Sequence, residues 1–204
     1  DNSETAGVDI AGNTFDALYA GVLNMLPQGP DTVDLNDFVT GNSFTNNAAE
    51  RPIQIYPSAG THNVIGTNEN EAFVGDWGLA GPLSFEGNGG EDRAWGSAQA
   101  DSFDGGSGAD QLFGNGGDDT LEGGLGNDWL DGDSGTDTAA YGGAATIGHT
   151  ATNWTVTDAG GTDTLTDVEI VDDSAAGKTL LVGLGGYATI QEAVDAAADG
   201  DTIM

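Results

Sequence analysis

A nine-residue repeat constrains the fold of this chain more than any other feature. Six blocks follow one another without a gap from Gly87 to Ala140: GNGGEDRAW, GSAQADSFD, GGSGADQLF, GNGGDDTLE, GGLGNDWLD and GDSGTDTAA. Every block has glycine at position one, aspartate at position six and an apolar residue at position eight. Tandem self-similarity at a short fixed period is typical of a solenoid, in which each unit becomes stable by stacking on its neighbours.

The blocks resemble the G-G-x-G-x-D-x-U-x nonapeptide of the RTX family, which forms a calcium-binding parallel β-roll. The resemblance implies that positions one to six form a turn and positions seven to nine a short strand. Two nonapeptides then make one coil, so each block stacks beneath the next block but one. Position eight points into the interior, and each ion lies between two stacked turns, held by position-six carboxylates and turn carbonyls.

The acids and glycines of the repeat are suited to calcium, which prefers six to eight oxygen ligands. Stacking places Asp92, Asp110 and Asp128 on one edge, and the other three aspartates on the opposite edge. Three stacked turns enclose two gaps, so we expect four well-formed sites. The predicted ligands and turn glycines are Asp92, Asp101, Asp110, Asp119, Asp128, Asp137, Gly87, Gly89, Gly105, Gly108, Gly114, Gly116, Gly123, Gly126, Gly132 and Gly135, with Glu71 as an outlying ligand.

Two degraded copies precede the regular blocks, at 66–74 and 78–86. Glu71 holds position six in the first, and we expect it to form a weaker site with Asp92. Leu83 holds that position in the second, so the gap beneath Asp101 is predicted to be poor or empty. Gln99 replaces a turn glycine and weakens the prediction for the lower site on the same edge.

The segments on either side of the repeat predict four regions in an all-β chain. Residues 1–65 contain GNTF and GNSF, 29 residues apart, and resemble the end of a right-handed parallel β-helix; an irregular β-sandwich is the alternative. Residues 66–143 form the β-roll, and 144–182 form a β-strand cap. Residues 183–204 resemble the start of a second, pectin-lyase-like β-helix, with one short capping helix and a first strand. We therefore expect a slice of a longer alternating array.

Composition limits the possible partners. The chain has 34 acidic and three basic residues, a formal charge of −31, and such a charge opposes a compact state unless cations neutralise it. Binding to nucleic acid needs lysine and arginine and is not expected. There is no cysteine, and no apolar run is long enough to span a membrane. Calcium is the expected cofactor; the other candidate partners are further domains or copies of the same protein, and glycans.

Two classes of function follow from these observations. The first is a calcium-binding structural segment of a large secreted or cell-surface repeat protein of adhesin, matrix or surface-layer type, exported by bacterial type I secretion. The second is an accessory fragment of a secreted polysaccharide-modifying enzyme, such as a lyase or an epimerase. His62 and His149 are the two histidines, and neither lies in a recognisable catalytic motif. We therefore expect no catalytic activity from this chain.

Overall fold

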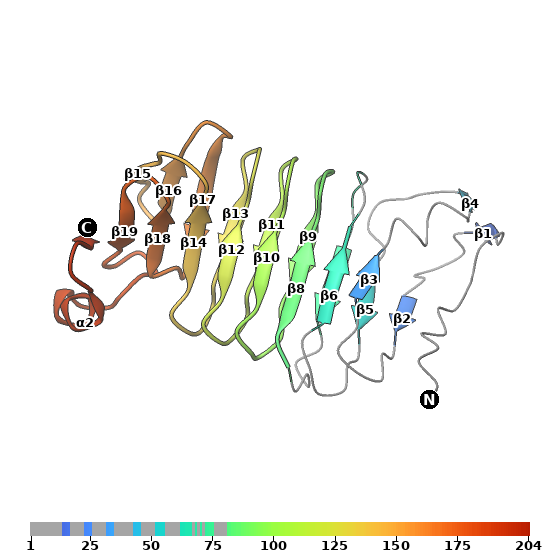
Figure 1. Cartoon of the computed structure of the whole chain (residues 1–204), viewed down its shortest axis with the longest axis horizontal. Coiled ribbons are helices and arrows are strands. Elements are labelled where there is room, and N and C mark those ends of the chain that lie inside the picture. The colour runs from blue at the N-terminus through green and yellow to red at the C-terminus, as the bar shows by residue number, and fades with distance from the viewer. Residues whose placement is uncertain are drawn as a thin grey trace, which may run out of the picture.

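The computed structural model of the chain is a β-solenoid in which the successive strands of the repeat alternate between two sheets (Figure 1). It describes residues 81–204 together with positions 14–16, 23–25, 32–34, 43–45, 52–55, 62–66, 68, 70 and 72–75. The predicted fold class, all-β with stacked parallel strands and one short helix near the C-terminus, is confirmed for this part of the chain.

Nine strands form one layer of the solenoid, which we call sheet 1. Its strands pair in parallel, except that β18 and β19 are antiparallel. In spatial order they are β20 (Thr202–Ile203), β19 (Gly177–Leu180), β18 (Ile170–Asp173), β14 (Thr138–Tyr141), β12 (Thr120–Glu122), β10 (Ser102–Asp104), β8 (Leu83–Glu86), β6 (His62–Ile65) and β3 (Thr32–Asp34).

The opposite layer, sheet 2, also has nine strands. Its first three strands are antiparallel neighbours and all its other pairs are parallel. In spatial order they are β15 (Thr146–His149), β16 (Trp154–Thr157), β17 (Thr162–Thr166), β13 (Trp129–Asp131), β11 (Gln111–Phe113), β9 (Arg93–Trp95), β7 (Ala72–Gly75), β5 (Pro52–Ile55) and β2 (Leu23–Met25). A separate parallel pair joins β1 (Thr14–Asp16) to β4 (Ser43–Thr45).

The nonapeptides stack as the repeat predicts. Phe103 lies opposite Leu121 in sheet 1, and Leu112 lies opposite Leu130 in sheet 2, so each block pairs with the next block but one. The two degraded copies keep this register, because Phe85 lies opposite Phe103 and Phe73 opposite Ala94. A hydrophobic residue at position eight is therefore sufficient to align a copy even where its turn has diverged.

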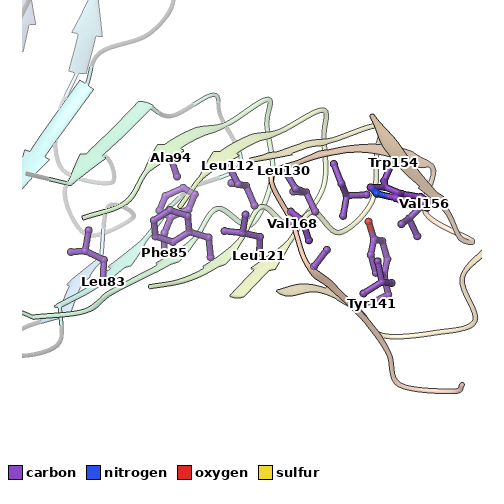
Figure 2. Close-up of a cluster of buried hydrophobic side chains, with 14 of the residues drawn as sticks. Leu83, Phe85, Ala94, Leu112, Leu121, Leu130, Tyr141, Trp154, Val156 and Val168 are labelled. Carbon is purple, nitrogen blue, oxygen red and sulfur yellow. The ribbon is translucent and has the colours of Figure 1, made fainter. Parts of the chain in front are cut away.

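The core lies between the two sheets and consists of two facing rows of side chains, with Ala94, Leu112 and Leu130 from sheet 2 and Phe85 and Leu121 from sheet 1 (Figure 2). Each three-residue strand of the roll buries its middle residue and leaves its two outer residues more exposed, as the alternation of a β-strand requires. The stacked rings of Phe73 and Phe85 lie 5.6 Å apart, and Phe103 meets both edge-on. One inward side chain for each strand makes a thin core, so the turns must contribute much of the stability.

The first region contains coils longer than those of the roll. Phe15 lies opposite Phe44 in a parallel pair, at the 29-residue spacing of the two GN[TS]F segments. This parallel pairing is that of stacked coils. Strands β5 and β6 continue into the roll by pairing with β7 and β8, so both sheets cross the predicted boundary at residue 65 without a break.

The segment 162–171 is divided between the two sheets. Its polar and apolar residues alternate without a break, which by itself predicts one strand, but the structure has β17 in sheet 2 and β18 in sheet 1. The chain turns at Asp167, which has a φ of 47°. Strand β17 stacks on β13 and β18 stacks on β14, so this segment forms one more coil of the solenoid. The antiparallel strands β15 and β16 extend sheet 2 beyond it.

The predicted helix is present as α2 (Ile190–Ala196), and it begins with a capping box formed by Thr189 and Glu192. Its apolar stripe is mostly uncovered. Ala193 is buried, whereas Ile190 and Val194 are 67% and 49% exposed. Strand β20 follows the helix and pairs in parallel with β19.

Candidate metal centre

The six position-six aspartates lie in two ladders, one along each edge of the roll. We call edge 1 the stack of turns 87–92, 105–110 and 123–128, and edge 2 the stack 96–101, 114–119 and 132–137. Every one of these aspartates is at most 3% exposed. Carboxylates are rarely buried to this extent unless they are paired or bind a metal ion.

One oxygen of each carboxylate builds the ladder. On edge 1 the Asp92 N–H donates to Asp110 Oδ1 (2.7 Å), and the Asp110 N–H donates to Asp128 Oδ1 (2.9 Å). On edge 2 the same bonds join Asp101 to Asp119 (2.7 Å) and Asp119 to Asp137 (2.8 Å). Each of these carboxylates therefore accepts a hydrogen bond from the backbone N–H of the residue 18 positions earlier, in the preceding coil.

The other oxygen has no protein partner at four of these residues. Within the described part of the chain, Oδ2 is buried and accepts no hydrogen bond in Asp110, Asp119, Asp128 and Asp137. An unsatisfied buried polar atom costs about 1–3 kcal/mol, and more when it carries charge. A row of such oxygens at equivalent places requires a common explanation, and a cation between the turns supplies it.

The glycine at position one makes room for these oxygens. A methyl group at Gly105 would lie 2.5 Å from Asp110 Oδ2 and 2.8 Å from the Gly123 carbonyl oxygen of the next turn. The same two kinds of atom surround Gly87, Gly96 and Gly114. Any side chain would therefore fill the space in which a carboxylate oxygen and a carbonyl oxygen from neighbouring turns converge.

The backbone takes a left-handed conformation at positions two and four of the regular turns. At position four these residues are glycines, with φ of 139° at Gly108, 146° at Gly126 and 156° at Gly135. The turn 96–101 departs from this form, since Ser97 and Gln99 are not among the described residues with positive φ. There Asp101 Oδ2 accepts a hydrogen bond from the Ser97 N–H (2.6 Å), so this carboxylate is satisfied within its own turn.

Burial changes the acidity of the ladder. Desolvation, with smaller contributions from neighbouring carboxylates, raises the pKa of Asp119 and of Asp137 to about 7. Desolvation also raises the pKa of Asp128 to about 7 and that of Asp110 to about 6. Without a cation, these carboxylates are thus held partly protonated near neutral pH, because the ionised form is poorly solvated.

The donor set fits calcium. Each gap between stacked turns offers carboxylate and carbonyl oxygens, the hard ligands that calcium takes. Among the described residues no three carboxylate or imidazole side chains converge on one point. A ladder supplies one carboxylate from each turn, so the backbone must provide much of the coordination. Asp92, Asp110 and Asp128 lie on edge 1, and Asp101, Asp119 and Asp137 lie on edge 2. Glu71 lies outside the described residues.

The ladders continue past the repeat at both ends. At the lower end the Leu83 N–H donates to Asp101 Oδ1 (2.7 Å), although Leu83 itself brings no carboxylate. At the upper end the Asp128 N–H donates to Asp163 Oδ1 (2.9 Å) and the Asp137 N–H donates to Glu169 Oε2 (2.8 Å). Sequence reasoning missed Asp163 and Glu169 because they interrupt the nine-residue period. The available signal was an acid two residues before an inward apolar residue, Leu165 and Val171.

Residues 86–121 and 104–139 match the family model of the RTX calcium-binding nonapeptide repeat, in four copies. The repeats are RTX nonapeptides. The RTX segment covers a minority of the chain, and it coincides with the part in which the two ladders are regular. Searches among curated proteins and among solved structures found no match. Because these repeats match the RTX calcium-binding nonapeptide, the segment is a calcium-binding repeat region. The number of calcium sites and the ligands of each site stay predictions.

Proposed function

We propose that this chain is a calcium-stabilised structural segment of a secreted or cell-surface repeat protein, of the adhesin, matrix or surface-layer kind, which folds when it meets extracellular calcium. The observation that carries the proposal is the row of buried, unpartnered Oδ2 atoms at Asp110, Asp119, Asp128 and Asp137. Without a cation these oxygens oppose folding, and with one they hold neighbouring coils together.

Calcium concentration sets where such a segment folds. Extracellular calcium modules often bind with dissociation constants of about 10⁻⁴–10⁻³ M. Ligand that binds the folded state alone stabilises it by about 2.7 kcal/mol when its concentration is 100 times the dissociation constant. The thin core gives the calcium-free roll little stability of its own. The chain would therefore stay unfolded in a calcium-poor cytosol and fold outside the cell, which suits bacterial type I export.

The structural role is supported by the continuity of the two sheets. Sheet 1 runs from β3 to β20 and sheet 2 from β2 to β15, with the RTX segment in the middle of both. A calcium-locked roll in this place fixes the relative position of the coils on either side. Among the described residues no helix is both long and apolar enough to cross a membrane.

A calcium titration followed by far-UV circular dichroism tests this proposal. We expect weak β structure in chelator and a cooperative gain of β structure at submillimolar to millimolar calcium. Magnesium at the same concentration is the matched control, because it demands a tighter octahedral shell and keeps its water. An unchanged spectrum after chelation would contradict the proposal.

The alternative is an accessory fragment of a polysaccharide-modifying enzyme. His149 is exposed; its Nδ1 lies 2.9 Å from the Thr150 carbonyl oxygen, and its ring packs edge-on against Trp154. This environment is that of a surface side chain of the cap. We expect no release of unsaturated products from alginate or pectin by the purified chain with calcium, and such release would favour the alternative.

A further inference from the structure

The cap imitates a pair of nonapeptide turns, although its sequence lies outside the repeat. On edge 1 the turn 158–163 stacks on the turn 123–128. Asp163 Oδ1 accepts the Asp128 N–H at 2.9 Å, as Asp128 Oδ1 accepts the Asp110 N–H. Gly161 lies against the Gly126 carbonyl as Gly126 lies against that of Gly108. Asp163 follows Asp128 by 35 residues instead of the usual 18, and it still lies where the aspartate of the next stacked block would lie.

Edge 2 ends in the same way with a shorter turn. Residues 167–169 link β17 to β18 and stack on the turn 132–137. The Asp167 carbonyl lies over Gly132, where the Gly132 carbonyl itself lies over Gly114 one coil earlier. Glu169 Oε2 accepts the Asp137 N–H at 2.8 Å. The turn has three residues instead of six, and the longer glutamate side chain makes up the difference.

Both terminal gaps contain an oxygen that the protein leaves unsatisfied. Asp128 is 3% exposed and Asp137 is fully buried. In each of them, Oδ2 has no hydrogen-bond partner among the described residues. If the cap were only a lid on the core, these last two carboxylates would face a neutral or donating partner. Instead, the turn above Asp128 brings the carboxylate of Asp163, and the turn above Asp137 brings the carboxylate of Glu169.

We propose that the cap completes two further calcium sites, one between the turns that carry Asp128 and Asp163, and one between the turns that carry Asp137 and Glu169. The cap then supplies three metal ligands from outside the nonapeptides: the carboxylates of Asp163 and Glu169 and the carbonyl of Asp167. This inference rests on the proposed function. Its consequence is that calcium ties the cap to the roll, in addition to holding the coils of the roll together.

Two conservative variants separate a ligand from a hydrogen-bonding cap. Asp163→Asn and Glu169→Gln each keep a carbonyl oxygen that can accept the backbone N–H and remove the negative charge. Asp199→Asn, on an exposed residue after α2, is the matched control. We expect native mass spectrometry at saturating calcium to show one bound ion fewer in each single variant and two fewer in the double variant. The control should keep the wild-type number.

The possible outcomes are distinct. If the wild-type chain binds no calcium, the proposed function fails and this inference with it. If the wild-type chain binds calcium and the variants keep the full number of ions, Asp163 and Glu169 are structural caps and this inference alone is overturned. Should a variant fold poorly, crystals of the wild-type chain grown with terbium decide the question. We expect anomalous density beside Asp163 and Glu169, and its absence there while the roll sites are filled would overturn the inference.

Discussion

At the scale of the residue, four ladder aspartates divide their carboxylates between two tasks: Asp110, Asp119, Asp128 and Asp137. In each, Oδ1 accepts a backbone N–H from the coil below, and Oδ2 faces the gap between turns. A change to asparagine separates these tasks because it keeps an oxygen for the first and removes the charge needed for the second. The aspartates of the repeat are thus both fold-building and ligand-binding residues, and substitution should affect stability differently with and without calcium.

We expect Asp119→Asn to lower the stability of the calcium-loaded chain by about 2–3 kcal/mol, the contribution of an ion present at about 100 times its dissociation constant. In chelator the same variant should keep at least as much residual β structure as the wild type, because it removes a desolvated carboxylate. Thermal unfolding in 10 mM calcium measures the first effect, and far-UV circular dichroism in chelator measures the second. Asp118→Asn is the control, since this exposed neighbour keeps its acceptor for the Thr136 N–H. Less β structure than the wild type in chelator would contradict the division of tasks.

The raised pKa values predict how acidity acts on the calcium-free chain. The pKa of Asp119, Asp128 and Asp137 is about 7 in the folded chain, against about 3.9 for an unfolded aspartate. A folded-state pKa above the unfolded value gives stability that is present below about pH 4 and is lost as the pH rises through 7. In chelator, the chain should therefore hold more β structure at pH 5 than at pH 8, as measured by far-UV circular dichroism.

Calcium should reverse this trend. Protons compete with the ion for the same oxygens, so calcium affinity rises from pH 5 to pH 8 and the loaded chain is more stable at pH 8. Melting curves in saturating calcium and far-UV spectra in chelator, each at both pH values, test the two trends. A calcium-free β signal that does not change between pH 5 and pH 8 would show that the carboxylates are not desolvated in the folded state.

At the scale of the element, the turn depends on close contact between successive coils. Gly108 has a φ of 139°, and a methyl group there would overlap the Gly90 carbonyl of the turn below. Gly108→Ala should therefore destabilise the calcium-loaded chain by at least about 2 kcal/mol, from backbone strain and steric overlap. Gly142→Ala is the matched control, because nothing lies within 4 Å of the position that its methyl group would take. Urea unfolding in saturating calcium compares the two, and similar midpoints would contradict the stacked-turn geometry.

The same elements show which parts of the structure could be predicted from sequence. The pairing of Leu112 with Leu130 was predictable because a strict period leaves one register that buries every position-eight residue. The last coil was not predictable in this way, since the strands β15 and β16 intervene between Asp128 and Asp163. A continuous alternating pattern over β17 and β18 also concealed the turn at Asp167, where the chain passes from one sheet to the other. The period of the sequence predicts the repeated coils only. The last coil follows the inserted strands β15 and β16 and is recognised from its contacts in the structure.

At the scale of the whole molecule, the charge and the calcium ladders act together. A formal charge of −31 opposes compaction, and the two ladders place six of the 34 acidic residues in buried rows. The ladders run along both edges of sheets that continue into the cap. Strand β17 pairs with β13 and β18 pairs with β14. Loss of calcium from the roll should therefore unfold the cap as well, in one transition.

Trp154 is suited to test this coupling, because it is 7% exposed within the cap and its Nε1 donates to the Gly183 carbonyl at 2.8 Å. In a variant with Trp77, Trp95 and Trp129 changed to phenylalanine, chelation should shift the Trp154 emission strongly to longer wavelength. Its calcium midpoint should equal that of the far-UV signal. A variant that keeps Trp129 alone, 45% exposed in the folded roll, should shift much less. If the Trp154 emission stayed unchanged in chelator while the β signal of the roll collapsed, the cap would be an independent folding unit, and calcium could not be what joins the two.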